Sequence, residues 1–252
     1  MALCHLRFFS QSLGKASEMF VLLPDSGEGP FPTLYLLHGL SDDASIWLRR
    51  SRVEWYARDW PLVVVMPDGG RGWYTNALQG DAYEDHILQD VMGQVERLFP
   101  VARERRRRAI AGLSMGGYGA LRLALKHPSL FAAAASLSGA VGIGHGPITD
   151  EMPPDFRRIF GDNPQGSEND LFALAQRVEL AQLPRLWLDC GVDDFLIEHN
   201  RAFHAHLQQL QVPHVYLEFP GGHTWDYWDE HIQQVLPFVM EAMEDELSAS
   251  TS

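Results

Sequence analysis

Three short runs of the chain are apolar at almost every position, and they limit the possible fold more than any other feature. They are residues 33–38 (TLYLLH), 62–66 (LVVVM) and 109–113 (AIAGL). A strand that is apolar on both faces is typical of a parallel sheet covered by helices on each side. Because amphipathic stretches separate these runs, the sequence predicts an α/β fold with a mostly parallel sheet.

The same reasoning predicts eight strands with helices between them. We expect the strands at residues 5–10, 19–23, 33–38, 62–66, 108–113, 132–137, 185–190 and 214–219. Helices are expected at about 83–99, 198–210 and 227–247. A further helix is expected from just after Ser114 to His127, where Pro128 ends it.

The chain of 252 residues suits one domain with a single core, and no repeat or long linker divides it. Residues 139–183 hold Gly, Pro and Asn clusters and are too long for an ordinary connection. We expect them to form a small cap over the strand ends, with two short helical pieces. The small, polar tail 248–252 is expected to be disordered.

The net charge of −13 disfavours nucleic acid and anionic membranes as partners. Five arginines fall within residues 103–108, but Glu104 interrupts them and no aromatic residue interleaves, so we expect a solvated loop. No apolar run of ~18 residues and no secretory signal is apparent. Cys4 and Cys190 are too few for a disulfide framework, so we expect a cytoplasmic protein. The sequence leaves a homo-oligomer open.

A candidate nucleophile lies where one predicted strand meets a helix. Residues 112–116 (GLSMG) match the pattern G-x-S-x-G around Ser114. The pattern alone is weak evidence, and a glycine-rich turn with an idle serine is the alternative. The preceding apolar strand and the following Ala- and Leu-rich helix favour a nucleophile elbow, in which the serine hydroxyl projects above the sheet.

A serine needs a base, and the base needs an orienting carboxylate. In this kind of fold the acid and then the histidine follow the serine in the chain. His223 follows a predicted strand and a Pro-Gly-Gly turn, which makes it the candidate base. The acid is expected after the preceding strand, where Asp194 is favoured, Asp193 remains open, and Asp189 lies within the strand.

Hydrolysis through a serine also needs two N–H donors for the oxyanion. The residue after the nucleophile, Met115, is expected to supply one. The loop after the strand at 33–38 is expected to supply the other, from Leu40. The neighbouring His38 is expected to be a structural hydrogen-bonding residue and not a catalyst.

Several segments together resemble the family of α/β hydrolases that includes esterase D and the tributyrin esterases. They are HGLSDD, GRGWYTNA, IAGLSMGGYGALRLALKHP, CGVDDFL and GGHTWDYW, and AGLSMGGYGA and GGHTW are the most specific. The resemblance spans almost the whole chain and is strongest to the compact tributyrin-type esterases. It implies the α/β-hydrolase fold, Ser114 as nucleophile, Asp194 as acid, His223 as base, and Leu40 and Met115 as oxyanion donors.

The resulting hypothesis is a serine esterase that hydrolyses short-chain acyl esters, such as acetyl or butyryl esters, through an acyl-enzyme. This chemistry requires no metal and no organic cofactor, and its partner is a small-molecule ester. Among the aromatic residues near the motifs, Trp73, Tyr74 and Trp225 are predicted to contact the substrate. The alternatives are a thioesterase of the S-formylglutathione hydrolase type, an acyltransferase, or a non-catalytic binding module, against which the intact Ser–Asp–His order argues.

Overall fold

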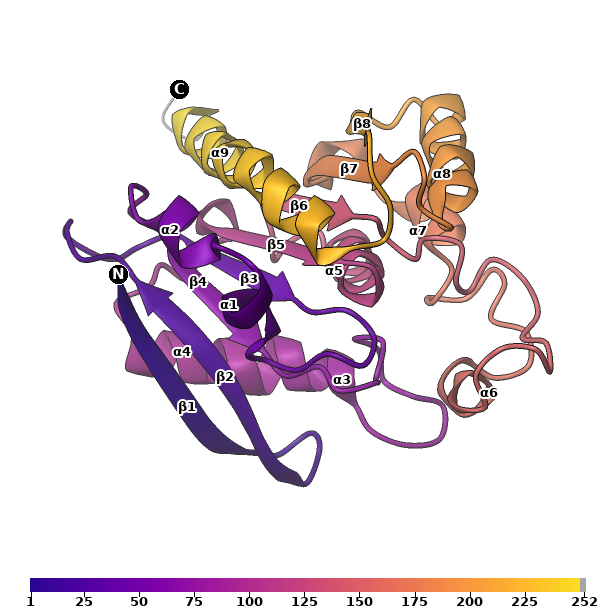
Figure 1. The fold of residues 1–252 in the computed structure, drawn as a ribbon, viewed down its shortest axis with the longest axis horizontal. Coiled ribbons are helices and arrows are strands. Elements are labelled where there is room, and N and C mark those ends of the chain that lie inside the picture. Colours follow the sequence, from indigo (N-terminus) through magenta and orange to yellow (C-terminus); the bar gives the residue numbers. More distant parts are fainter. Residues whose placement is uncertain (250–252) are drawn as a thin grey trace.

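In the computed structural model, which describes residues 1–249, the chain folds around one eight-stranded sheet (Figure 1). The strands are β1 (Ala2–Ser10), β2 (Lys15–Leu23), β3 (Thr33–Leu37), β4 (Val63–Pro67), β5 (Arg108–Leu113), β6 (Ala133–Leu137), β7 (Arg185–Gly191) and β8 (Val215–Phe219). Their order in the sheet is β1-β2-β4-β3-β5-β6-β7-β8. The pairs from β4 to β8 are parallel, while β2 is antiparallel to both β1 and β4.

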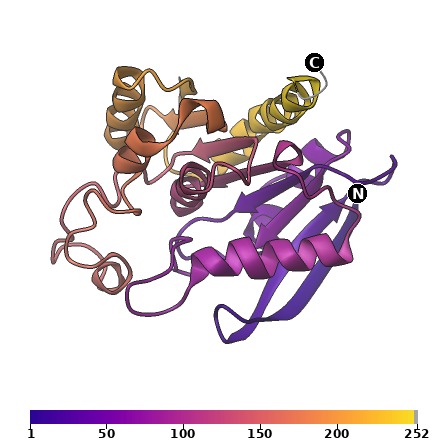
Figure 2. The ribbon, with the colours of Figure 1, turned by 180° about the vertical axis from the view of Figure 1, so that it is seen from behind.

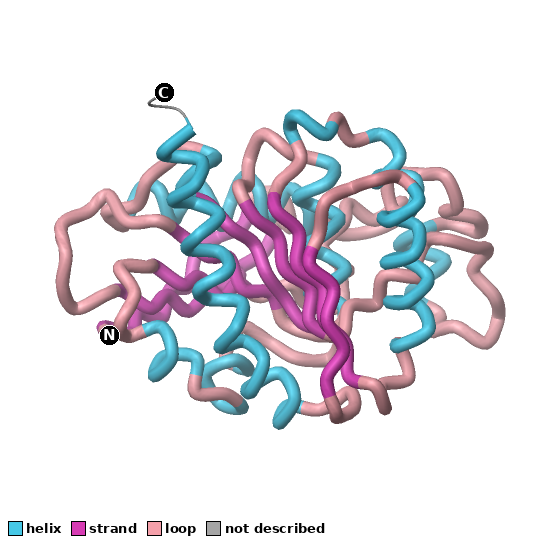
Figure 3. The backbone as a smooth tube through the Cα atoms, turned by 90° about the horizontal axis from the view of Figure 1, so that it is seen from above, coloured by secondary structure: helices cyan, strands magenta, loops and turns pink. Residues whose placement is uncertain are grey.

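Helices cover both faces of the sheet, because alternate residues of each strand point to opposite sides (Figure 3). Leu34 and Leu36 of β3 pack toward α1 (Ile46–Arg50), α2 (Val53–Ala57) and α9 (Trp225–Ala249). Tyr35 and Leu37 pack toward the opposite layer. That layer contains α3 (Tyr83–Asp85), the π-helical η1 (His86–Val91), α4 (Met92–Leu98), α5 (Met115–Lys126) and α8 (Ile197–Gln209).

The observed elements confirm the predicted mostly parallel eight-stranded sheet with flanking helices. The largest differences lie in β1 and β2, which begin earlier than predicted and form a hairpin around Gly14 at φ +63°. Most of β1 is exposed or half-buried, so its apolar signal is weak. The five-residue helices α1 and α2 were not predicted, because one turn of helix leaves little periodicity to detect.

Residues 139–183 leave the sheet and hold α6 (Asp155–Phe160), α7 (Leu171–Arg177) and the short 3₁₀ turn η3 (Leu180–Gln182). Figure 2 shows α6 on a long excursion beyond the strand ends. An ion cluster around the buried Arg122 ties this excursion to the core. The fully buried Arg122 of α5 contacts Glu84 at 2.6 Å, Glu168 at 3.3 Å and the side-chain oxygen of Asn169 at 2.9 Å.

The structure bears on two further predictions, a solvated loop at the arginines of residues 103–108 and a disordered tail at residues 248–252. Arg105 and Arg107 donate hydrogen bonds to the backbone oxygens of Pro128 and Pro30, so these side chains brace neighbouring loops. Helix α9 extends to Ala249, which takes in the first two residues of the tail expected to be disordered, and residues 250–252 lie outside the described part. Within residues 1–249 no helix combines the length and apolar character that crossing a membrane demands.

Candidate active site

The candidate nucleophile Ser114 occupies the sharp turn between β5 and α5. Its backbone is left-handed, with φ 52° and ψ −115°, a conformation that costs of order 1–3 kcal/mol in a residue with a side chain. Its N–H donates to Leu137 O at 2.9 Å, and its carbonyl accepts from Tyr118 N at 3.0 Å and Ala140 N at 3.1 Å. These bonds tie the strained turn to β6, to the start of the cap segment and to α5.

The glycines of this turn are required by close backbone approach. A Cβ atom on Gly116 would lie 2.6 Å from Leu37 O and 2.7 Å from His38 O. A Cβ atom on Gly112 would collide with the backbone of Gly116. The G-x-S-x-G spacing therefore lets α5 pack directly against the ends of β3 and β5.

We expect Gly116→Ala to destabilise the protein by about 1–3 kcal/mol, because backbone atoms must shift to accept the methyl group. The matched control is Gly93→Ala in α4, where a Cβ atom would meet nothing within 4 Å. That exposed helical substitution should instead stabilise by roughly 0.5–1 kcal/mol. Urea unfolding midpoints at unchanged slope measure both. A more stable Gly116→Ala together with a less stable Gly93→Ala, or two variants of unchanged stability, would contradict the steric argument.

The structure brings together the three residues singled out as a possible triad. His223 Nε2 lies 3.0 Å from Ser114 Oγ, and His223 Nδ1 lies 2.8 Å from Asp194 Oδ2. A neutral imidazole that donates its Nδ1 proton to Asp194 leaves Nε2 free to accept the serine proton. The arrangement can thus remove a proton from Ser114 as it attacks an electrophile.

Asp194 is held in place by its own loop. Its second carboxylate oxygen accepts from Leu196 N at 2.8 Å, and its side chain is fully buried. Burial alone would raise the pKa of the Asp194 carboxyl, but the hydrogen bonds from His223 and Leu196 outweigh it and hold that pKa below its usual value. The carboxylate therefore stays ionised opposite His223.

The other two aspartates of this segment have different surroundings. Asp193 is exposed, and its N–H donates to Gly221 O at 2.9 Å, which docks the acid loop on the turn before His223. Asp189 is buried within β7 and accepts from Trp187 Nε1 at 2.7 Å and Tyr227 OH at 2.9 Å. Burial raises the pKa of Asp189 to about 7 despite these bonds. Neither side chain takes the place of Asp194 beside His223.

His38 anchors the loop that carries Leu40, as expected of a structural residue. It is 1% exposed, accepts from Gly69 N at 2.8 Å, and contacts Gly39 O through Nδ1 at 2.8 Å. Gly39 C=O and Leu40 N–H belong to one trans peptide, so they point in opposite directions. A Cβ atom on Gly39 would lie 3.7 Å from Ser114 Cβ, which places this loop against the nucleophile.

Two residues predicted to contact substrate are buried. Tyr74 has no exposed surface, and its hydroxyl donates to His38 O at 2.9 Å, so we replace the predicted substrate contact by a supporting role for the loop. Trp73 is 3% exposed and packs edge-on against Tyr118, Phe156 and Phe160 at 5.0–5.8 Å. Both have left-handed backbones, with φ 54° and 53°. Burial of residues on a loop is not visible in the sequence.

Other aromatic rings surround His223. Trp228 lies edge-on to it at 4.9 Å and is buried, while Phe195 lies 4.6 Å from it and is exposed. The predicted substrate contact Trp225 is half-buried and packs between Trp47 at 5.2 Å and Trp228 at 5.3 Å. Trp225 thus contacts Trp228, which in turn contacts His223.

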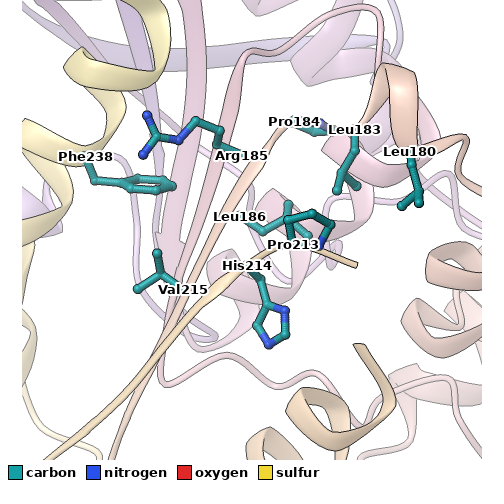
Figure 4. Close-up of a pocket in the computed structure, with 9 residues that line it drawn as sticks. All are labelled: Leu180, Leu183, Pro184, Arg185, Leu186, Pro213, His214, Val215 and Phe238. Carbon is teal, nitrogen blue, oxygen red and sulfur yellow. The ribbon is translucent and has the colours of Figure 1, made fainter. Parts of the chain in front are cut away.

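Two cavities are relevant to where a ligand can bind. One of about 350 Å³ is lined by Leu180, Leu183, Pro184, Arg185, Leu186, Pro213, His214, Val215 and Phe238 (Figure 4). It lies where β7 and β8 begin, whereas Asp194 and His223 follow the ends of these strands. A second, of about 310 Å³, lies beneath the cap loop 142–148 and is also lined by Phe172 and His199. The second cavity lies at the carboxyl ends of the parallel strands, which is the same end of the sheet that carries the triad.

A family model described as "Putative esterase" matches residues 10–239. The chain belongs to this esterase family. An acetyl esterase of Caldicellulosiruptor saccharolyticus is 31% identical in an alignment 257 residues long. The alignment covers 92% of this chain and 96% of the relative. The esterase Rv1288 of Mycobacterium tuberculosis is 30% identical and matches 88% of this chain, which spans 56% of that longer relative.

Solved structures agree with this assignment. The fluorophosphonate-binding serine hydrolase FphF of Staphylococcus aureus has a TM-score of 0.85 at 33% identity, and the alignment covers 94% of this chain and 98% of FphF. The S-formylglutathione hydrolase FrmB of the same organism has a TM-score of 0.82 at 32% identity, with the same coverage. The esterase therefore has the α/β-hydrolase fold and is a serine hydrolase of the carboxylic ester class, as predicted.

Proposed function

We propose that this esterase hydrolyses short-chain acyl esters, with Ser114 as nucleophile, His223 as general base and acid, and Asp194 as the orienting carboxylate. The observation that carries the proposal is the hydrogen-bonded row from Asp194 through His223 to Ser114, with distances of 2.8 and 3.0 Å. Serine, base and acid also follow one another in the chain order typical of the fold.

In the first half of the reaction, His223 Nε2 takes the proton of Ser114 as Oγ bonds to the ester carbonyl carbon. The protonated His223 then gives that proton to the alcohol oxygen as the ester bond breaks, which leaves Ser114 acylated. In the second half, a water molecule gives its proton to His223 and attacks the acyl carbon. His223 returns the proton to Ser114 Oγ, and the carboxylic acid departs.

The developing oxyanion needs donors aimed at it, and we assign this role to the N–H groups of Met115 and Leu40. Met115 is the first residue of α5, where a backbone N–H has no partner within the helix and lies at its positive end. The Leu40 assignment is supported by His38, which holds the opposite end of the same peptide. One such donor is worth about 3–4 kcal/mol of transition-state stabilisation.

The short acyl chain is supported by a group of packed aromatic rings that begins one helical turn after the nucleophile. Tyr118 lies one helical turn after Ser114, and Trp73, Phe156 and Phe160 fill the space beside it. Four packed rings leave little room for a long chain in that direction. The relative named acetyl esterase also supports a small acyl group.

A panel of p-nitrophenyl esters from acetate to decanoate tests the acyl preference. We expect kcat/KM to be highest at acetate or butyrate and to fall by about tenfold or more at decanoate, because each extra methylene must be accommodated against packed rings. Initial rates below the solubility limit of each ester measure this. A maximum at octanoate or longer would contradict the short-chain proposal.

The second candidate function is thioester hydrolysis, favoured by the likeness to the S-formylglutathione hydrolase FrmB. The same triad can act on either carbonyl, so geometry does not separate the two. Including S-formylglutathione in the panel does so. A kcat/KM for this thioester well above that for p-nitrophenyl acetate would replace the carboxylesterase proposal.

A further inference from the structure

Phe195 presents an apolar ring to solvent beside the triad. It is 75% exposed, more than any other large apolar side chain in the described part of the chain. Exposing so much of a phenylalanine loses the free energy of its burial, about 25 cal/mol per Å² of apolar surface. A single exposed apolar residue is ordinary, so the position of Phe195 carries the argument rather than its exposure alone.

That position is against the ring of His223. The two ring centroids are 4.6 Å apart at 51°, while Trp228 contacts His223 at 4.9 Å and is itself buried. The imidazole thus contacts both a buried indole and an exposed phenyl ring, and 18% of its side chain remains exposed. Phe195 forms a solvent-facing aromatic wall against the imidazole ring that moves the proton.

The backbone on either side of Phe195 is fixed by hydrogen bonds to its neighbour Asp194. Leu196 N donates to Asp194 Oδ1 at 2.8 Å, and Ile197 N donates to Asp194 O at 3.0 Å. The carboxylate that orients His223 therefore also fixes the backbone that carries the phenyl ring. A segment whose backbone is already ordered loses less entropy when a ligand packs on it.

Proton transfer determines which part of an ester meets this ring. His223 Nε2 has to reach the oxygen of the departing alcohol, so the alcohol portion lies beside His223 while the acyl portion stays with Ser114. Resting on the proposed function, we infer that Phe195 binds the alcohol portion, and that the preferred substrates carry an apolar or aromatic alcohol. Aromatic pairing with Phe195 supplies the specificity.

Benzyl acetate and methyl acetate test this inference, because they share an acyl group and their alcohols have similar acidity. We expect Phe195→Ala to lower kcat/KM for benzyl acetate by about tenfold, mostly through KM, and for methyl acetate by less than about twofold. Phe195→Tyr, which keeps the ring, should retain the preference for benzyl acetate. The matched control Phe9→Ala removes another exposed ring, at 56%, from the opposite edge strand β1 and should change neither ester.

Other outcomes overturn the inference in distinct ways. An equal fall in kcat for both esters would make Phe195 a support for His223 only. A changed ratio of methyl butyrate to methyl acetate would place the ring beside the acyl group instead. If the wild type hydrolyses both acetates and reacts with a fluorophosphonate, but Phe195→Ala leaves their ratio unchanged, the inference fails while the proposed function stands. If the wild type does neither, the proposed function itself fails.

Discussion

Replacing Ser114 with alanine is expected to lower kcat for ester hydrolysis by about 10⁴- to 10⁶-fold, the range typical when a triad nucleophile is removed. The variant retains the hydrogen-bonding backbone of the elbow, so its free energy of unfolding should change little. It should also lose covalent labelling by a fluorophosphonate, which reacts with an activated serine. Activity assays, labelling and mass spectrometry of the modified peptide measure these effects.

The matched control is Ser138→Ala. Ser138 is also a left-handed serine at the end of a strand, with φ 47°, and is fully buried. Because the Ser138 side chain also helps to lower the pKa of the Asp194 carboxyl, the variant should keep fluorophosphonate labelling of Ser114 while losing a small part of the activity. Labelling of Ser114→Ala at the wild-type rate would place the nucleophile elsewhere and would remove the basis of the proposed mechanism.

The fold could be predicted largely because its central strands are buried on both faces. Residues of β3, β4 and β5 are all buried, so nearly every position in them is apolar. The outer hairpin was harder to delimit. Its ends extend into solvent, where β1 alternates between exposed and half-buried residues and where polar side chains are tolerated.

The candidate site divides in the same way between local and long-range features. The elbow at Ser114 can be recognised locally, since Gly112 and Gly116 approach each other within the turn, although Gly116 also lies against the end of β3. The exposure of Phe195 and the burial of Tyr74 depend on neighbours distant in the chain. Tyr74, for instance, is covered because its hydroxyl reaches His38 and its ring lies against Gly69 and Gly119.

Local sequence favoured Asp194 as the acid but left Asp193 open. Both follow the glycine that ends β7, and a turn can direct either carboxylate inward. What decides the geometry is a tertiary contact, in which Asp193 N donates to Gly221 O and Val192 N donates to Phe219 O. These bonds lay the acid loop along the end of β8 and leave Asp193 outside.

Substituting Asp194 by asparagine is therefore expected to lower kcat by about 10⁴-fold, while Asp193→Asn should change it by less than about threefold. Asparagine keeps the size of the side chain, but its amide can donate to His223 Nδ1 and so favour the tautomer with the proton on Nε2. That tautomer cannot accept the proton of Ser114. Because Asp193 and Asp194 are adjacent and the exchange is the same, the pair separates orientation of His223 from a general loss of negative charge.

The pair also gives a reading that does not depend on turnover. Fluorophosphonate labelling of Ser114 should slow strongly in Asp194→Asn and remain near the wild-type rate in Asp193→Asn, with thermal unfolding confirming that both variants fold. A large loss in Asp193→Asn with activity retained in Asp194→Asn would reverse the assignment. Comparable losses in both would mean that His223 responds to the summed charge of the loop, and the hydrogen bond from Asp194 would then lose its assigned role in catalysis.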